Sequence, residues 1–206
     1  MMLRKVFDMD NPVMQGLGMA FNLMLLNIIA IISALPVFTS GASLTALFDV
    51  SQRLVRGDDI YIAKTFFSSF RSNFKKGAVT GAIFILAAIL VALNYLAARE
   101  VAPVLRYCSM AIAMLLSATA IYTFALTARF ENDIKSSIVN AVKLMAAYFP
   151  RTLAILIFTI CYYLLGRHFP QIGMPVFMLF GLSLPVYVYS IICSPIINTL
   201  AEKEQA

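Results

Sequence analysis

Charged residues are scarce in this sequence. Only 13% of its 206 residues are charged and 61% are hydrophobic, whereas a soluble domain carries about 25% charged residues. So few charges cannot cover the surface of a water-soluble protein of this length, and the composition indicates an integral membrane protein. No polar stretch is long enough for a second domain, so we expect residues 1–206 to form a single membrane domain.

Histidine and cysteine are equally rare, which argues against a metal or redox site. The chain has one histidine, His168, and its three cysteines, Cys108, Cys161 and Cys193, are widely separated within apolar stretches. Zinc and redox motifs need such residues at short spacings, so we expect no metal and no cofactor. Walker A loops, His-Glu-x-x-His motifs and nucleophile elbows are missing from the sequence as well, and we expect a protein that is not an enzyme.

Apolar stretches mark the candidate transmembrane helices. A helix rises 1.5 Å per residue and needs about 20 apolar residues to cross the hydrocarbon core. The clear stretches are 17–35, 77–98, 104–128, a shorter one at 152–166, and 174–197. Pro185 lies in the middle of the last stretch, where we expect a kink. The first stretch is longer than a usual signal-peptide core and further spans follow, so we expect it to be retained.

The positive charges favour a sixth helix at 41–56. With that helix crossing, 13 of the 16 Lys and Arg residues, Arg4 and Lys5 among them, lie in the cytoplasm, as the positive-inside rule expects. We therefore predict an all-α bundle of about six transmembrane helices in three hairpins, with both termini cytoplasmic, in the plasma membrane. Residues 41–56 reach only about 24 Å, so a re-entrant helix packed against its neighbours is the alternative.

Two segments between the predicted hairpins, 60–76 and 133–151, have one apolar and one charged face. We expect both to form amphipathic helices on the cytoplasmic leaflet, where they contact anionic headgroups or a partner protein. Each ends in a Phe-x-basic pattern, Phe74-Lys75-Lys76 and Phe149-Pro150-Arg151, 75 positions apart, which suggests an internal repeat of a surface helix and a hairpin. The residues of this interfacial face are Phe66, Phe70, Arg71, Phe74, Lys75, Lys76, Lys143 and Arg151.

One acid, Asp49, lies deep in an apolar stretch. An ionised carboxylate there costs about 2.5–3.5 kcal/mol on insertion scales, so a neighbour must offset it. Arg53 follows one helical turn later, and Asn22 and Asn27 lie at similar depths in the preceding span. We predict a polar seam of these four residues, either as a structural contact between helices or as a site for a cation, a proton or a sugar hydroxyl.

Two further features bear on partners. Gly77 and Gly81 form a G-x-x-x-G pattern, which allows close helix contact within the chain or in a homo-oligomer. The net charge of +6 is explained by the positive-inside distribution, so we expect the lipid bilayer and no nucleic acid as a partner.

Residues 7–50, "FDMDNPVMQGLGMAFNLMLLNIIAIISALPVFTSGASLTALFDV", resemble the YesL-like family of bacterial integral membrane proteins, as do "AKTFFSSFRSNFKKGA" and "NAVKLMAAYFPRTLAILI". The most specific element is the outer-turn motif, matched at Leu35, Pro36, Gly41, Ala42, Ser43 and Ala46. The family is a domain of unknown function whose members resemble proteins encoded beside sugar ABC transporters. The resemblance implies an accessory role in carbohydrate uptake, by contact with a transporter permease or ATPase. The alternative is a small transporter or channel for a sugar or ion, with its polar site around Asp49.

Overall fold

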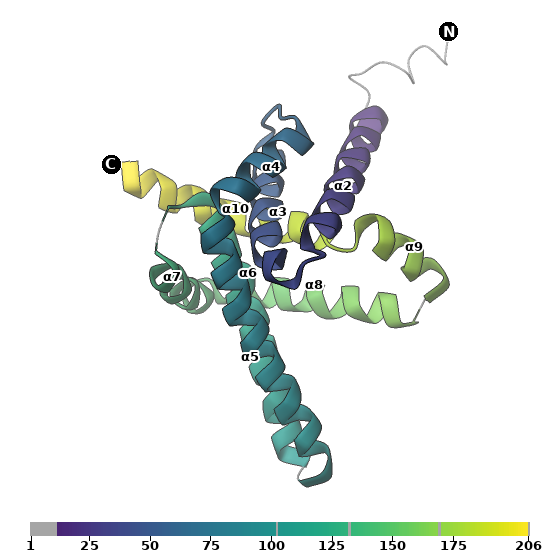
Figure 1. Ribbon diagram of the computed structural model, residues 1–206, viewed down its shortest axis with the longest axis vertical. Helices are drawn as coiled ribbons and strands as arrows, with labels where there is room; N and C mark the ends of the chain where they lie inside the picture. The colour runs from purple at the N-terminus through teal and green to yellow at the C-terminus, as the bar shows by residue number, and fades with distance from the viewer. Residues whose placement is uncertain (1–11, 102, 132, 169, 206) are drawn as a thin grey trace.

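Helices are the only regular secondary structure in the described residues, 12–101, 103–131, 133–168 and 170–205 of a computed structural model. This confirms the predicted all-α class. The helices of Figure 1 are α2 (Pro12–Ala34), the 3-10 helix η1 (Val37–Thr39), α3 (Ser40–Arg56), α4 (Ile62–Ser72), α5 (Phe74–Val101), α6 (Pro103–Arg129), α7 (Ile134–Ala147), α8 (Phe149–His168), α9 (Pro170–Phe180) and α10 (Ser183–Gln205).

Five of these helices are long and apolar enough to cross a membrane. They contain the candidate spans Met14–Ala34, Phe74–Ala98, Val104–Arg129, Phe149–His168 and Ser183–Glu202. The sixth predicted span, 41–56, is the helix α3, which is shorter and more polar than these five; its crossing stays a prediction. Arg4 and Lys5, which the charge count places in the cytoplasm, lie outside the described residues.

The last predicted span is wrong as a single helix over 174–197. The structure divides it into α9 and α10, with a break at Gly181 and Leu182. Pro185, where a kink was expected, instead lies in the first turn of α10, where the missing N–H of proline costs no helical hydrogen bond. The helix is therefore interrupted at Gly181, four residues before Pro185, and is not kinked at the proline itself.

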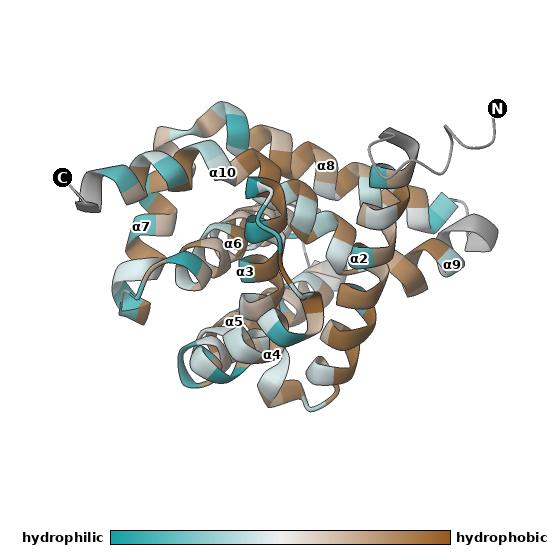
Figure 2. Ribbon diagram, turned by 90° about the horizontal axis from the view of Figure 1, so that it is seen from above, coloured by the Kyte–Doolittle hydropathy of each residue, from teal (hydrophilic) through white to brown (hydrophobic). Residues whose placement is uncertain are grey.

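The helices cross at large angles. In Figure 1, α5 and α6 form a long hairpin along the vertical axis, and α8 and α10 run across it. The α5–α6 hairpin was predicted, but the molecule is not a bundle of three parallel hairpins. Figure 2 shows the apolar residues (brown) along α2 and α8 and hydrophilic residues (teal) around α7 and toward the C-terminal end of α10.

The central helix is α3, which packs against α2, α4, α5, α6 and α10. Its residues from Gly41 to Gln52 are almost all buried. The polar side chains among them bond to neighbouring backbones: Ser43 donates to the Ala30 carbonyl at 2.8 Å, and Gln52 donates to the Ala125 carbonyl at 2.9 Å. A helix too polar to face lipid is thus sheltered by more apolar helices, which is the packing that the re-entrant alternative requires.

The outer-turn motif joins α2 to α3. Leu35 and Pro36 are exposed at the turn, whereas Gly41, Ala42, Ser43 and Ala46 are buried in α3. A Cβ at position 41 would lie 2.6 Å from the Cα of Gly81, and one at position 77 would lie 2.8 Å from the Cα of Ala42. The G-x-x-x-G pattern therefore lies against α3 of the same chain, and it serves close packing of α3 on α5.

Both predicted amphipathic helices form, as α4 and α7, and each is followed after one residue by a candidate span. Asn73 separates α4 from α5, and Tyr148 separates α7 from α8, so the 75-residue offset is retained in the helix boundaries. The expectation that their apolar faces lie on lipid is wrong for the buried side chains: Phe66 of α4 is fully buried, because α4 packs on α2 and α3. Helix α7 likewise packs on α6, with Ala141 and Leu144 buried.

Candidate functional site

A polar cavity of about 610 Å³ lies between the second half of α3, the helix α4, the start of α5 and the end of α6. This volume is in the range of small-molecule sites, although the cavity is open on one side. Seven charged side chains line it: Asp49, Arg53, Asp59, Lys64, Lys76, Arg129 and Glu131. An open cavity with both signs of charge can bind polar or charged groups of a ligand or a partner.

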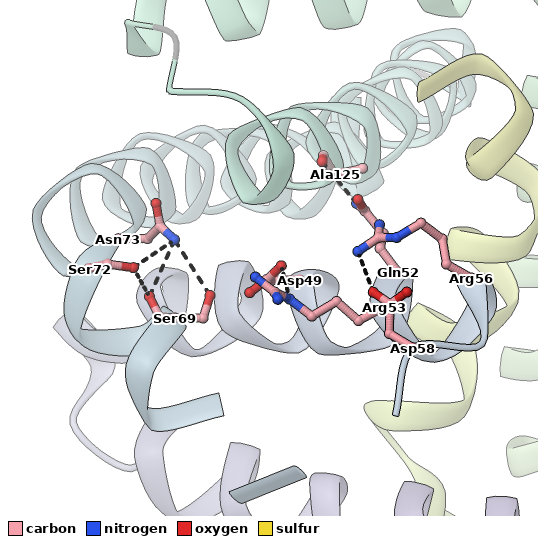
Figure 3. Close-up of polar contacts among 9 residues, drawn as sticks. All are labelled: Asp49, Gln52, Arg53, Arg56, Asp58, Ser69, Ser72, Asn73 and Ala125. Carbon is pink, nitrogen blue, oxygen red and sulfur yellow. Dashed lines mark hydrogen bonds and ion pairs between the residues drawn. The ribbon is translucent and has the colours of Figure 1, made fainter. Parts of the chain in front are cut away.

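Helix α4 gives the cavity a hydroxyl-bearing wall. Thr65, Ser68, Ser69 and Ser72 recur at helical spacing and all line the cavity, whereas the aromatic residues of the helix lie elsewhere on its circumference. At the end of the helix the side-chain amide of Asn73 donates to the Ser69 carbonyl and to the Ser72 hydroxyl, both at 3.3 Å (Figure 3). These bonds hold the polar junction between α4 and α5 at the cavity.

Asp49, the acid that lies within an apolar stretch of the sequence, lines this cavity. Asp49 accepts a hydrogen bond from Nε of Arg53 at 3.0 Å, and the two side chains are 11% and 42% exposed (Figure 3). The structure thus contains the predicted contact one turn apart. Asp49 therefore has a charged partner, and a polar cavity lies beside it; both offset the cost of placing a carboxylate among apolar helices.

Asn27 is not part of that contact, so the predicted four-residue seam is wrong. Asn27 is fully buried; its side chain donates to the Met178 carbonyl at 2.9 Å and accepts from the backbone N–H groups of Leu182 and Ser183, at 2.8 and 3.2 Å. Asn27 therefore supplies hydrogen-bond partners to backbone groups on both sides of the break between α9 and α10. Asn22, one and a half turns earlier on α2, is half-buried and is not brought to Asp49.

The residues of the predicted interfacial face have different environments in the structure: some are buried or bonded, and others are exposed. Phe66 is buried and stacks on Phe70, with ring centres 6.2 Å apart, so Phe66 is not available to lipid or to a partner. Lys76 is half-buried and donates to the Glu131 carbonyl at 3.1 Å. The guanidinium of Arg151 lies 5.4 Å from the ring centre of Tyr148. The exposed members of the face are Arg71, Phe74, Lys75 and Lys143.

Most of the residues that line the cavity were not predicted from the sequence. The hydroxyl residues of α4 repeat at i, i+3, i+4 and i+7, and this pattern could have been recognised. The contribution of Arg129 and Glu131 could not, because nothing in the chain indicates that the end of α6 lies beside α4. Among the described residues, no three His, Cys, Asp or Glu side chains are placed to hold a metal ion.

Five apolar helices are long enough to span a membrane, and four of them, α2, α5, α6 and α10, pack on the polar central helix α3. They define a multi-pass α-helical membrane protein. Residues 22–95 match the family described as "Protein of unknown function, DUF624". The matched segment runs from α2 through α3 and α4 into α5, so it includes the outer turn, Asp49, Arg53 and the α4 wall of the cavity. No curated protein and no solved structure matches the chain.

Proposed function

We propose that this protein is a non-enzymatic accessory protein of bacterial carbohydrate uptake in the plasma membrane, which acts by contact with a sugar ABC transporter. The resemblance to the YesL-like family supplies the kind of partner, a permease or an ATPase. The observation that supports action by contact is the open, charged cavity at the junction of α3, α4, α5 and α6, next to the exposed cations Arg71 and Lys75.

The charges of this region favour recognition over chemistry. Asp49 is paired with Arg53, and Lys76 is bonded to a backbone carbonyl; Lys64, Asp59 and Glu131 are exposed at the cavity. Exposed charges around a polar opening steer and orient a partner more than they add affinity. The positive-inside prediction places this end in the cytoplasm, where the ATPase subunits of such transporters lie.

Co-purification tests this proposal. After gentle solubilisation and crosslinking, we expect the intact protein to recover a sugar transporter component. A Lys64→Glu/Lys75→Glu variant should recover about tenfold less, which corresponds to ~1.4 kcal/mol. Arg167→Glu, a charge reversal on the predicted outer side, is the matched control and should recover as much as wild type. Recovery of no transporter component by wild-type protein would contradict the proposal.

A small transporter or channel is the second candidate, because the central helix is unusually polar. Ser43, Thr45, Ser51 and Gln52 of α3 are buried, and the cavity reaches α3 at Asp49. Reconstituted vesicles should then show flux of a sugar or an ion, and Asp49→Asn should abolish that flux, and sugar-dependent growth, at normal membrane abundance. Loss of the Asp49→Asn protein from the membrane would instead show that Asp49 is a structural contact.

A further inference from the structure

An apolar groove of about 600 Å³ runs along one face of the α5–α6 hairpin, away from the polar cavity. It exists because small side chains recur at helical spacing on both helices. Ala88 and Ala92 line it from α5, and Ala113, Ser117 and Ala120 line it from α6. Larger side chains such as Phe84 and Leu116 flank these positions, so the small residues leave an unfilled channel between bulky neighbours.

The groove has one closed end and one end with a fixed cation. The start of α3 closes it at Gly41 and Leu44, where α3 meets Gly81. Tyr95 lines the other end, and there the Nε of Arg106 donates to the Tyr95 hydroxyl at 3.0 Å while its guanidinium lies 5.2 Å from the ring centre. A guanidinium has five N–H donors and this bond uses one, so the group can still bind an anion.

The dimensions and the position of the groove match a lipid chain. From Gly81 to Tyr95 the helix rises about 21 Å, which exceeds the ~15 Å half-thickness of a hydrocarbon core. Tyr95 and Arg106 lie near the ends of the candidate spans Phe74–Ala98 and Val104–Arg129, where Tyr and Arg side chains reach the headgroup level of a bilayer.

We propose that this groove binds one acyl chain of a phospholipid, with the lipid phosphate on Arg106. The phosphate complements the cation held at the open end, and the chain fills the apolar channel down to the start of α3. A helix of a second copy fits less well, because a helix with its side chains is about 10–12 Å across and would need roughly three times the groove volume over the same length.

Lipid retention by the whole protein tests the proposal. We expect native mass spectrometry of protein purified in mild detergent to show one retained phospholipid per chain, and delipidated protein to rebind phosphatidylglycerol. Ala113→Phe, which fills the groove, should lower the occupancy about tenfold, or ~1.4 kcal/mol. The matched control is Ala111→Phe, an exposed position on the same helix that does not line the groove, and it should retain the lipid.

Arg106→Gln tests the contact with the lipid phosphate separately from the contact with the acyl chain, because it leaves the residues that line the groove unchanged. It should lower phosphatidylglycerol binding several-fold while the thermal midpoint of unfolding stays within a few degrees of wild type, and Arg167→Gln should have no effect on binding. Equal lipid occupancy in Ala113→Phe and Ala111→Phe overturns the proposal. So does conversion of a wild-type dimer into a monomer by Ala113→Phe at unchanged lipid content, because the groove would then be an interface between copies.

Discussion

At the scale of single residues, Asn27 bonds to the backbone on both sides of the break between α9 and α10. A break in a membrane helix leaves N–H and C=O groups without partners, and in hydrocarbon each costs several kcal/mol. The Asn27 amide satisfies three of them, one from α9 and two at the start of α10. Tyr162 adds a fourth bond, from its hydroxyl to the Gly181 carbonyl at 3.3 Å.

Replacing Asn27 with leucine should therefore destabilise the protein severely. The change removes the side-chain partner of the Met178 carbonyl and of the N–H groups of Leu182 and Ser183, whose bonds to Asn27 are buried or partly buried, at ~1–3 kcal/mol for each. We expect the free energy of unfolding in mixed micelles to fall by at least ~3 kcal/mol, and protease cleavage near Gly181 to appear. Asn22→Leu, on the same helix, is the control and should change the free energy by less than ~1 kcal/mol. Equal losses in both variants would contradict the capping role.

At the scale of elements, two contacts position the polar central helix. The glycines of α3 and α5 allow those two backbones to approach closely, and α4 covers the other side of α3 with Ile62, Phe66 and Ser69. Together they hold Asp49 and Arg53 at the cavity, since both α4 and the start of α5 are cavity walls.

Gly41→Ala should separate α3 from α5. The new Cβ would lie 2.6 Å from the Cα of Gly81, and since both atoms belong to backbones the helices themselves must move, at a cost of ~2–3 kcal/mol in the free energy of unfolding. Gly18→Ala on α2 is the control, because a Cβ there has no atom within 4 Å. Denaturant unfolding in micelles measures both. If Gly41→Ala were as stable as Gly18→Ala, the close contact would be wrong.

Phe66→Ala should detach α4 from the core. Phe66 is fully buried, and deletion of such a ring costs ~3–5 kcal/mol. Phe67, the next residue along the chain, is 55% exposed, and Phe67→Ala should cost less than ~1 kcal/mol. Thermal unfolding and hydrogen exchange of α4 measure the difference. Similar effects of the two substitutions would indicate that α4 lies on lipid, as first expected from the sequence.

At the scale of the whole molecule, the charge count and the helix packing bear differently on how α3 lies in the bilayer. The charge count requires α3 to cross, whereas the structure surrounds α3 with other helices and places α8 and α10 across the α5–α6 hairpin. The start of α3 at Gly41 lies against Gly77 and Gly81 near the start of α5, whereas the six-span topology places positions 41 and 77 on opposite sides of the membrane. This contact favours the re-entrant alternative.

Cysteine labelling decides between a crossing and a re-entrant α3. In a variant with the three native cysteines replaced, a crossing α3 predicts that a membrane-impermeant maleimide applied to intact cells labels Phe38→Cys and leaves Asp58→Cys unlabelled until lysis. Both positions are exposed in the structure. Arg167→Cys and Lys135→Cys are the outer and inner controls. Labelling of positions 38 and 58 from the same side would show that α3 is re-entrant and would remove the basis of the six-span count.

The sequence determined much of the local structure. Apolar runs located α5, α6 and α8 to within a few residues of their observed bounds, because hydrophobicity marks the segments that leave water; the helices then extend into their polar flanks, where hydropathy gives no signal. Helical spacing likewise predicted that α4 and α7 form, and the i,i+4 spacing predicted the Asp49–Arg53 contact. Each of these follows from interactions within one or two turns of the chain.

Only the tertiary structure decided which surfaces meet. It separated Asn27 from Asp49 and brought Asn27 to a helix break more than 150 residues away. It also buried Phe66 of α4 against neighbouring helices, where the sequence had predicted contact with lipid. It also assembled the polar cavity from four helices whose contacts no periodicity encodes. The physical reason is that an amphipathic pattern specifies which face of a helix avoids water, but any apolar surface, protein or lipid, can cover that face, and the choice among them depends on how all the helices pack at once.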